Sequence, residues 1–205
     1  MNKLTDFVRI YDNNLSAKFC GKIINAFDAD EEHHIKSTIG IPRTPNLGIR
    51  DAIEMNCTKR AADSSEWTVI MDVLNRHAAS SFERYKHDLI VSGYPAEQLF
   101  NTVMLEQWRM HRYDPDKHYY KEHIDAIDAR TSKRMLMMLY YLNTVEEGGE
   151  TSFKTINIKV KPVEGRLAIT PAWFGYPHSA ETPITNTKYM IKTYLHYPGE
   201  HNANN

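Results

Sequence analysis

Apolar side chains recur at helical spacing in two places before Pro95. The first stripe consists of Leu15, Phe19, Ile23, Ile24 and Phe27. The second follows Asp63-Ser64-Ser65-Glu66, a sequence typical of a helix N-cap, and runs from Trp67 to Tyr85. Because an amphipathic helix buries its apolar stripe against another element, both segments are predicted to be helices that pack on a sheet.

After Pro95 the apolar period changes from that of a helix to that of a strand. Residues 103–113 alternate between two faces. Residues 135–142 are apolar on both faces, which is typical of a central strand that is covered on each side. Further strand-like runs, separated by turn residues, are 7–10, 119–126, 153–160, 166–170 and 188–197. The second half of the chain is therefore predicted to be β-sheet.

This order of elements predicts an α+β, mainly β fold: a double-stranded β-helix (jelly roll) with supporting N-terminal helices. We expect one domain over residues 1–205, with helical support over about 1–98, the jelly-roll core over about 99–197 and a polar tail at 198–205. Residues 38–56 are rich in glycine and proline and form either a mobile lid or a long connection, of which the lid is slightly favoured.

The composition and charge of the chain argue against nucleic acid and membranes as binding partners. The 205 residues include 25 Lys and Arg against 26 Asp and Glu, so net charge gives no attraction to nucleic acid or to a membrane. No apolar run is long enough to cross a bilayer, and the N-terminus lacks a secretory-type run. We therefore expect a cytoplasmic protein, and a bacterial or viral source fits this expectation. Oligomeric state is left open.

One stretch of the chain carries the candidate chemistry. His123 and Asp125 lie two residues apart in a predicted strand, so their side chains point the same way, and His178 follows in an apolar setting. Two imidazoles and one carboxylate are the ligand set of a facial-triad ferrous site, which leaves coordination positions open. In a chain with ten histidines, each of these residues alone is better explained as an ordinary core or surface residue. The case depends on their combination with Lys188, ten residues after His178.

The order of these residues resembles that of a known family. Residues 99–197 are similar to the prolyl 4-hydroxylase-like iron(II) and 2-oxoglutarate dioxygenases. The resemblance implies that His123, Asp125 and His178 bind Fe(II). It implies that Lys188 binds the distal carboxylate of 2-oxoglutarate, with O2 as the second cosubstrate and ascorbate as an optional reductant.

Further residues match positions of the same family. Tyr113 and Tyr141 correspond to tyrosines of the 2-oxoglutarate site, and Tyr120 to a tyrosine that lines the pocket. Arg134 resembles a basic residue near the substrate entrance. The Gly-Gly-Glu-Thr turn at 148–151 is a frequent feature of the family.

Two positions depart from the family pattern. Tyr194 stands six residues after Lys188, where related hydroxylases often have Trp. Lys192 shares a strand face with Lys188 and is an alternative partner for the carboxylate, although the spacing favours Lys188. Arg109 is expected to project toward the pocket, and Trp173 is either substrate-facing or part of the core.

The resemblance implies an oxygenase that converts 2-oxoglutarate to succinate and carbon dioxide while it hydroxylates a peptidyl proline or another protein side chain. The main alternative is the same chemistry on a small molecule. The neutral net charge argues against a nucleic-acid substrate. A non-catalytic jelly-roll binding module and a zinc hydrolase remain as less favoured alternatives, because neither needs a lysine and a tyrosine placed to bind an oxo acid. The sequence does not name the substrate, since loops set specificity.

Overall fold

The larger of two antiparallel sheets forms the centre of the computed structural model, which describes residues 3–39, 44–100 and 102–198. Its strands are β1 (Arg9–Tyr11), β2 (Ile35–Lys36), β6 (Ile53–Asn56), β7 (Met104–Leu105), β8 (Arg109–Tyr113), β10 (Arg134–Tyr141), β13 (Leu167–Pro171) and β15 (Lys188–His196). The order is β1-β13-β10-β15-β8-β6-β2, with β7 paired to β15.

The smaller sheet carries two of the predicted metal ligands. Its strands are β5 (Arg50–Asp51), β9 (Tyr119–His123), β11 (Thr151–Phe153), β12 (Ile158–Val160) and β14 (His178–Ala180), in the order β12-β11-β14-β9-β5. A separate two-stranded sheet pairs β3 (Thr38–Ile39) with β4 (Thr44–Pro45).

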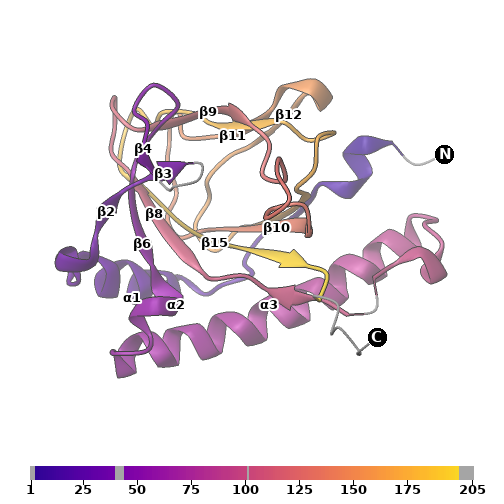
Figure 1. Cartoon of the computed structure of the whole chain (residues 1–205), viewed down its shortest axis with the longest axis horizontal. Coiled ribbons are helices and arrows are strands. Elements are labelled where there is room, and N and C mark those ends of the chain that lie inside the picture. The colour runs from indigo at the N-terminus through magenta and orange to yellow at the C-terminus, as the bar shows by residue number, and fades with distance from the viewer. Residues whose placement is uncertain (1–2, 40–43, 101, 199–205) are drawn as a thin grey trace.

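The described helices are η1 (Leu4–Phe7), α1 (Ala17–Asp28), η2 (Glu31–His33), α2 (Cys57–Arg60), α3 (Ser65–Val91), η3 (Ala96–Gln98) and η4 (Lys154–Ile156). Of these, α1, α2 and α3 lie against the larger sheet, on the side away from β9, β11 and β12 (Figure 1). Ser16 caps α1 by accepting from Phe19 N at 3.3 Å, and Ser64 caps α3 by accepting from Trp67 N at 3.4 Å. Both predicted helices are thus confirmed. None of the helices in the described ranges has the length and hydropathy to span a membrane.

Strand β10 separates two apolar cores. Leu136 and Met138 belong to the core that includes α1 and α3. Met137 and Leu139, which alternate with them, belong to the core that includes Phe153 of the smaller sheet. The central strand that was predicted from its two apolar faces is therefore confirmed.

The predicted strand at 103–113 is broken into β7 and β8. Between them, Trp108 N donates to Thr58 Oγ1 at 2.8 Å, and Trp108 Nε1 donates to Asn75 Oδ1 at 2.8 Å. These bonds tie the chain to α2 and α3 in place of the sheet, which apolar alternation alone does not reveal.

The segment at 38–56 is not a lid over its whole length. Its C-terminal part forms β5 in the smaller sheet and β6 in the larger one, so both sheets hold it in place. Residues 40–43 of this segment, and all of the predicted polar tail except Pro198, lie outside the described residues.

Candidate metal and cosubstrate site

His123 and Asp125, which are two residues apart, are brought together with the distant His178. His123 ends β9 and His178 begins β14, and the two residues face each other in the pairing of these strands. Their ring centres are 4.3 Å apart. Asp125 Oδ1 lies 3.7 Å from His123 Nε2, and Asp125 Oδ2 lies 3.4 Å from His178 Nε2. The ligand atoms all lie within 4.8 Å of one another, close enough for one metal ion to bind all three.

Asp125 reaches this position differently from the prediction. The strand was expected to continue to residue 126, but β9 ends at His123. Beyond it, Asp125 O accepts from Arg134 Nη1 at 3.0 Å, and Ala126 N donates to Ala172 O at 3.0 Å. A turn bonded to β10 and to the loop before His178 therefore places the carboxylate.

Both histidines have their Nδ1 atoms committed to the backbone. His123 Nδ1 donates to Lys121 O at 2.8 Å, and His178 Nδ1 donates to Tyr176 O at 3.1 Å. Because a carbonyl only accepts, the proton lies on Nδ1 and the Nε2 lone pair is free for a metal. His123 Nε2 and Asp125 Oδ2 are buried without a hydrogen-bond partner among the described residues. The donor set and its unsatisfied atoms fit a divalent metal.

Burial sets the protonation state of the triad. It lowers the pKa of His123 to about 3 and also lowers the pKa of His178. Burial would raise the pKa of Asp125, but the Lys192 ammonium, the two imidazoles and a hydrogen bond from Tyr194 together hold that pKa below its usual range. Two neutral imidazoles and a carboxylate are the protonation states that metal binding requires.

The predicted 2-oxoglutarate residues also meet. Lys188 is fully buried, and its Nζ donates to Gly149 O at 2.6 Å and lies 5.4 Å from the ring centres of both Tyr113 and Tyr141. Tyr141 Oη donates to Thr151 Oγ1 at 2.8 Å. Burial lowers the pKa of Lys188 to about 7, although nearby acidic groups act against this shift. The Gly-Gly-Glu-Thr turn thus contributes a direct contact to Lys188 and another to Tyr141.

A cavity of about 980 Å³ lies beside the triad, and His123 and Asp125 are part of its wall. Of the residues predicted for the substrate pocket, Tyr120, Arg134, Arg109 and Tyr194 line this cavity. Trp173 does not belong to the wall: its ring packs on Tyr176, with ring centres 5.2 Å apart.

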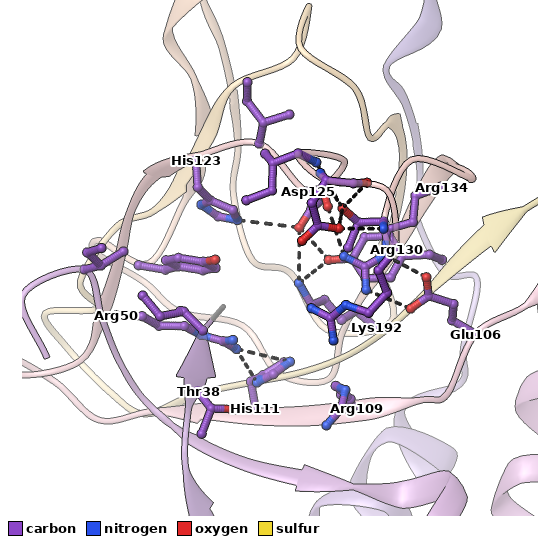
Figure 2. Close-up of a pocket in the computed structure, with 18 of the residues that line it drawn as sticks. Thr38, Arg50, Glu106, Arg109, His111, His123, Asp125, Arg130, Arg134 and Lys192 are labelled. Atoms are coloured by element: carbon purple, nitrogen blue, oxygen red, sulfur yellow. Dashed lines mark hydrogen bonds and ion pairs between the residues drawn. The ribbon is translucent and has the colours of Figure 1, made fainter. Parts of the chain in front are cut away.

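Arg50 also belongs to the site, although its position in the sequence does not predict this. It is 5% exposed and lies over the Tyr120 ring at 4.7 Å, and Tyr120 in turn stacks on His123 with ring centres 3.4 Å apart. Arg50 also bonds to His111 Nδ1 at 2.9 Å (Figure 2). It belongs to β5, whose strand character was hidden within a segment interpreted as a lid.

Arg134 and Lys192 complete the wall near Asp125. Arg134 makes two hydrogen bonds to the Glu106 carboxylate, at 2.7 and 2.8 Å, and its guanidinium lies 4.0 Å from the Tyr194 ring centre. Lys192 Nζ lies 3.9 Å from Asp125 Oδ1, and Figure 2 shows both His123 and Lys192 directed toward Asp125. This wall is therefore rich in cationic groups.

A protein-family model matches part of the chain. The model of the 2OG-Fe(II) oxygenase superfamily matches residues 108–196, a span that runs from β8 to β15 and contains the triad and Lys188. No curated protein matches the chain.

Solved structures with a similar fold include three prolyl hydroxylases. The viral collagen prolyl hydroxylase of Paramecium Bursaria Chlorella virus-1, in complex with 2OG, is 19% identical over 94% of this chain and 97% of that chain, with a TM-score of 0.65. The prolyl hydroxylase of Trichoplax adhaerens was solved in complex with a peptide fragment of the hypoxia inducible factor oxygen degradation domain. It is 15% identical over 94% of this chain and 84% of that chain, with a TM-score of 0.68. The prolyl-4-hydroxylase of Pseudomonas putida is 16% identical over 94% of both chains, with a TM-score of 0.60. These similarities confirm the predicted jelly-roll fold.

Proposed function

We propose that this chain is an oxygenase of the 2OG-Fe(II) kind, whose family model matches residues 108–196, and that it hydroxylates a peptidyl proline or another protein side chain. Fe(II) is its metal, and 2-oxoglutarate and O2 are its cosubstrates. We assign the metal to His123, Asp125 and His178. Ascorbate as a reductant stays a prediction.

The observation that carries the assignment is the set of unsatisfied ligand atoms. His123 Nε2 and Asp125 Oδ2 are buried, point into one small space with His178 Nε2, and lack hydrogen-bond partners among the described residues. A buried polar atom left unpaired costs free energy, about 1–3 kcal/mol, so such a cluster is expected to serve a ligand. When bound there, Fe(II) supplies the activation of O2 that is coupled to the decarboxylation of 2-oxoglutarate.

Lys188 is assigned to the distal carboxylate of 2-oxoglutarate. An ammonium has three N–H donors, and Gly149 O accepts one of them, so two donors remain for a carboxylate. Tyr113 and Tyr141 flank the ammonium and exclude water from it. A carboxylate that binds here gains a charge-assisted hydrogen bond in a buried environment, where such bonds are strong.

The cavity wall supports a peptide substrate. The two bonds from Arg134 to Glu106 fix a planar cation beside Tyr194, and such a surface can receive a peptide backbone. The similar structure from Trichoplax adhaerens holds a peptide fragment, which is consistent with this proposal for the present chain.

The test combines two products. Purified protein with Fe(II), 2-oxoglutarate and a set of proline-containing peptides is expected to release succinate and to add one oxygen atom to a peptide, detected by mass spectrometry. His178→Ala and Lys188→Ala should release none, whereas Lys159→Ala, at an exposed lysine on β12, should match the natural protein. Succinate release that depends on a free amino acid, with no peptide oxygenated, would replace the peptide substrate by a small molecule.

A further inference from the structure

Lys192 lies beside the triad but has no part in the proposed function. It stands four residues after Lys188 on β15, so both side chains project from the same face of the strand. Its side chain is 11% exposed and lines the 980 Å³ cavity, whereas Lys188 is not part of the cavity wall. We propose that Lys192 is the centre of a second carboxylate-binding subsite, inside this cavity and separate from Lys188. The inference rests on the proposed function, because it takes Asp125 as a metal ligand.

The partners of Lys192 do not satisfy its charge. Its Nζ donates to Tyr194 Oη at 2.7 Å, and Tyr194 in turn donates to Asp125 Oδ1 at 2.5 Å. Among the described residues, Asp125 is the one carboxylate within 4.0 Å of Lys192, at 3.9 Å. If Asp125 binds the metal, its negative charge is shared with another cation. Lys192 is then left with a neutral phenol, and a buried ammonium without an anion is costly.

Neighbouring cations increase the need for an anion. The Arg134 guanidinium forms an ion pair with the Glu106 carboxylate. Arg50 lies 3.4 Å from the Glu54 carboxylate, but Glu54 also pairs with Arg109 at 2.8 Å, so this one carboxylate serves both arginines. Arg50 lines the same cavity, and its Nε is buried without a hydrogen-bond partner among the described residues. Lys192 and Arg50 therefore both offer unused donors to a bound anion.

The ligand chemistry that fits is a carboxylate. Lys192 Nζ donates one hydrogen to Tyr194 Oη and keeps two N–H donors for an anion next to the metal position, where a carboxylate can accept hydrogen bonds on both oxygens. Two molecules could bring that group to the cavity. One is 2-oxoglutarate, whose oxo-acid end must lie next to the triad if the metal binds it. The other is the substrate, through an acidic side chain or a free carboxylate close to the reacting carbon.

Binding measurements on the Fe(II)-loaded protein without O2 separate these sources. The first arm titrates 2-oxoglutarate by calorimetry into the natural protein, Lys192→Met, Lys192→Arg and the control Lys159→Met. The second arm titrates two proline peptides, with Glu or Gln beside the proline, into the same proteins saturated with 2-oxoglutarate. If 2-oxoglutarate supplies the carboxylate, Lys192→Met should weaken its binding about tenfold or more, and Lys192→Arg should restore most of the affinity.

If the substrate supplies the carboxylate, the natural protein should bind the Glu peptide about tenfold more tightly than the Gln peptide, and Lys192→Met should lose this preference. Either result supports the subsite. If Lys192→Met matches Lys159→Met in both arms, whether or not the peptides bind, the subsite is overturned. Failure of the natural protein to bind 2-oxoglutarate overturns the proposed function itself, so the two failures are distinguishable.

Discussion

Tyr194 donates its phenolic hydrogen to Asp125 Oδ1 over 2.5 Å, and both groups are buried. This short bond to a charged acceptor orients the carboxylate and leaves Oδ2 directed toward His178. Tyr194 occupies the position at which the sequence departs from the hydroxylases it resembles. A residue that departs from the family pattern thus supports the predicted metal ligand.

Loss of the Tyr194 hydroxyl should weaken metal binding. Tyr194→Phe removes the bond that orients Asp125, and the loss of such an outer partner commonly lowers metal affinity 10- to 100-fold. We expect the Kd for Fe(II), measured by calorimetry without O2, to rise about tenfold. Tyr197→Phe is the matched control, because Tyr197 is 52% exposed. Equal affinity in both variants would show that the Tyr194 bond has no part in metal binding.

The affinity for 2-oxoglutarate should fall as the pH rises above neutrality. Burial lowers the pKa of Lys188 from its ordinary value of 10.5 to about 7, so the charged form predominates in the free protein only below about pH 7. Above that pH, binding of the dianion requires uptake of a proton, and the Kd should rise by up to about tenfold per pH unit. The two histidines assigned to the metal are not expected to gain a proton in this pH range, because burial lowers the pKa of both below the ordinary value.

Lys188→Arg separates this titration from other effects of pH. A guanidinium stays charged throughout, so the Kd of the variant should be nearly independent of pH between 6 and 9, even if its absolute affinity is lower. A Kd of the natural protein that is equally flat over this range would mean that Lys188 keeps its proton, or that another group binds the carboxylate.

The glycine turn before β11 should tolerate no side chain. Gly148 has φ +76°, and a Cβ atom there would lie 2.5 Å from Thr182 O. Gly148→Ala is expected to lower the free energy of unfolding by about 2–3 kcal/mol, measured by urea denaturation, and to displace the Gly149 carbonyl from Lys188. Gly93→Ala is the control, because Gly93 has φ +87° and a Cβ atom there would have no neighbour within 4 Å. Its free energy of unfolding should fall by about 1 kcal/mol, from backbone strain alone. Equal losses would argue against the steric contact.

Arg50 should be a large contributor to stability. Arg50→Met removes a buried cation from Glu54 and from the Tyr120 ring, and breaking a buried ion pair costs about 3–5 kcal/mol. Glu54 remains paired with Arg109 in this variant, so we expect a loss at the lower end of that range, about 3 kcal/mol in the free energy of unfolding. Arg76→Met, which removes an exposed pair with Asp72 on α3, should change it by less than about 0.5 kcal/mol. Similar small losses in both variants would contradict the structural role of Arg50.

Helices and strands can be predicted from the sequence where the period of the apolar residues alone determines which side chains are buried. The two apolar faces of β10 and the apolar stripes of α1 and α3 reflect simple burial, so they were visible in the sequence. His123 and His178 were found through the type and spacing of residues. Their facing positions across the β9 and β14 pair could not be derived, because strand pairing between distant segments is not encoded in local pattern.

The parts that were missed depend on contacts between distant segments. Arg50 lies in a run rich in glycine and proline, and its burial arises only because β5 pairs with β9. The break between β7 and β8 depends on Thr58 and Asn75. The spacing presents Lys192 as an alternative to Lys188, and it does not reveal that the cavity wall includes Lys192 but not Lys188.

The central claim is that His123, Asp125 and His178 hold Fe(II) with positions open for 2-oxoglutarate. Its most direct test is the visible absorption spectrum of the Fe(II)-loaded protein without O2, recorded before and after addition of 2-oxoglutarate. The natural protein and His87→Ala, at a histidine 74% exposed on α3, should both develop a charge-transfer band, and His178→Ala should develop none. Absence of the band in the natural protein, or an unchanged band in His178→Ala, would contradict the assignment.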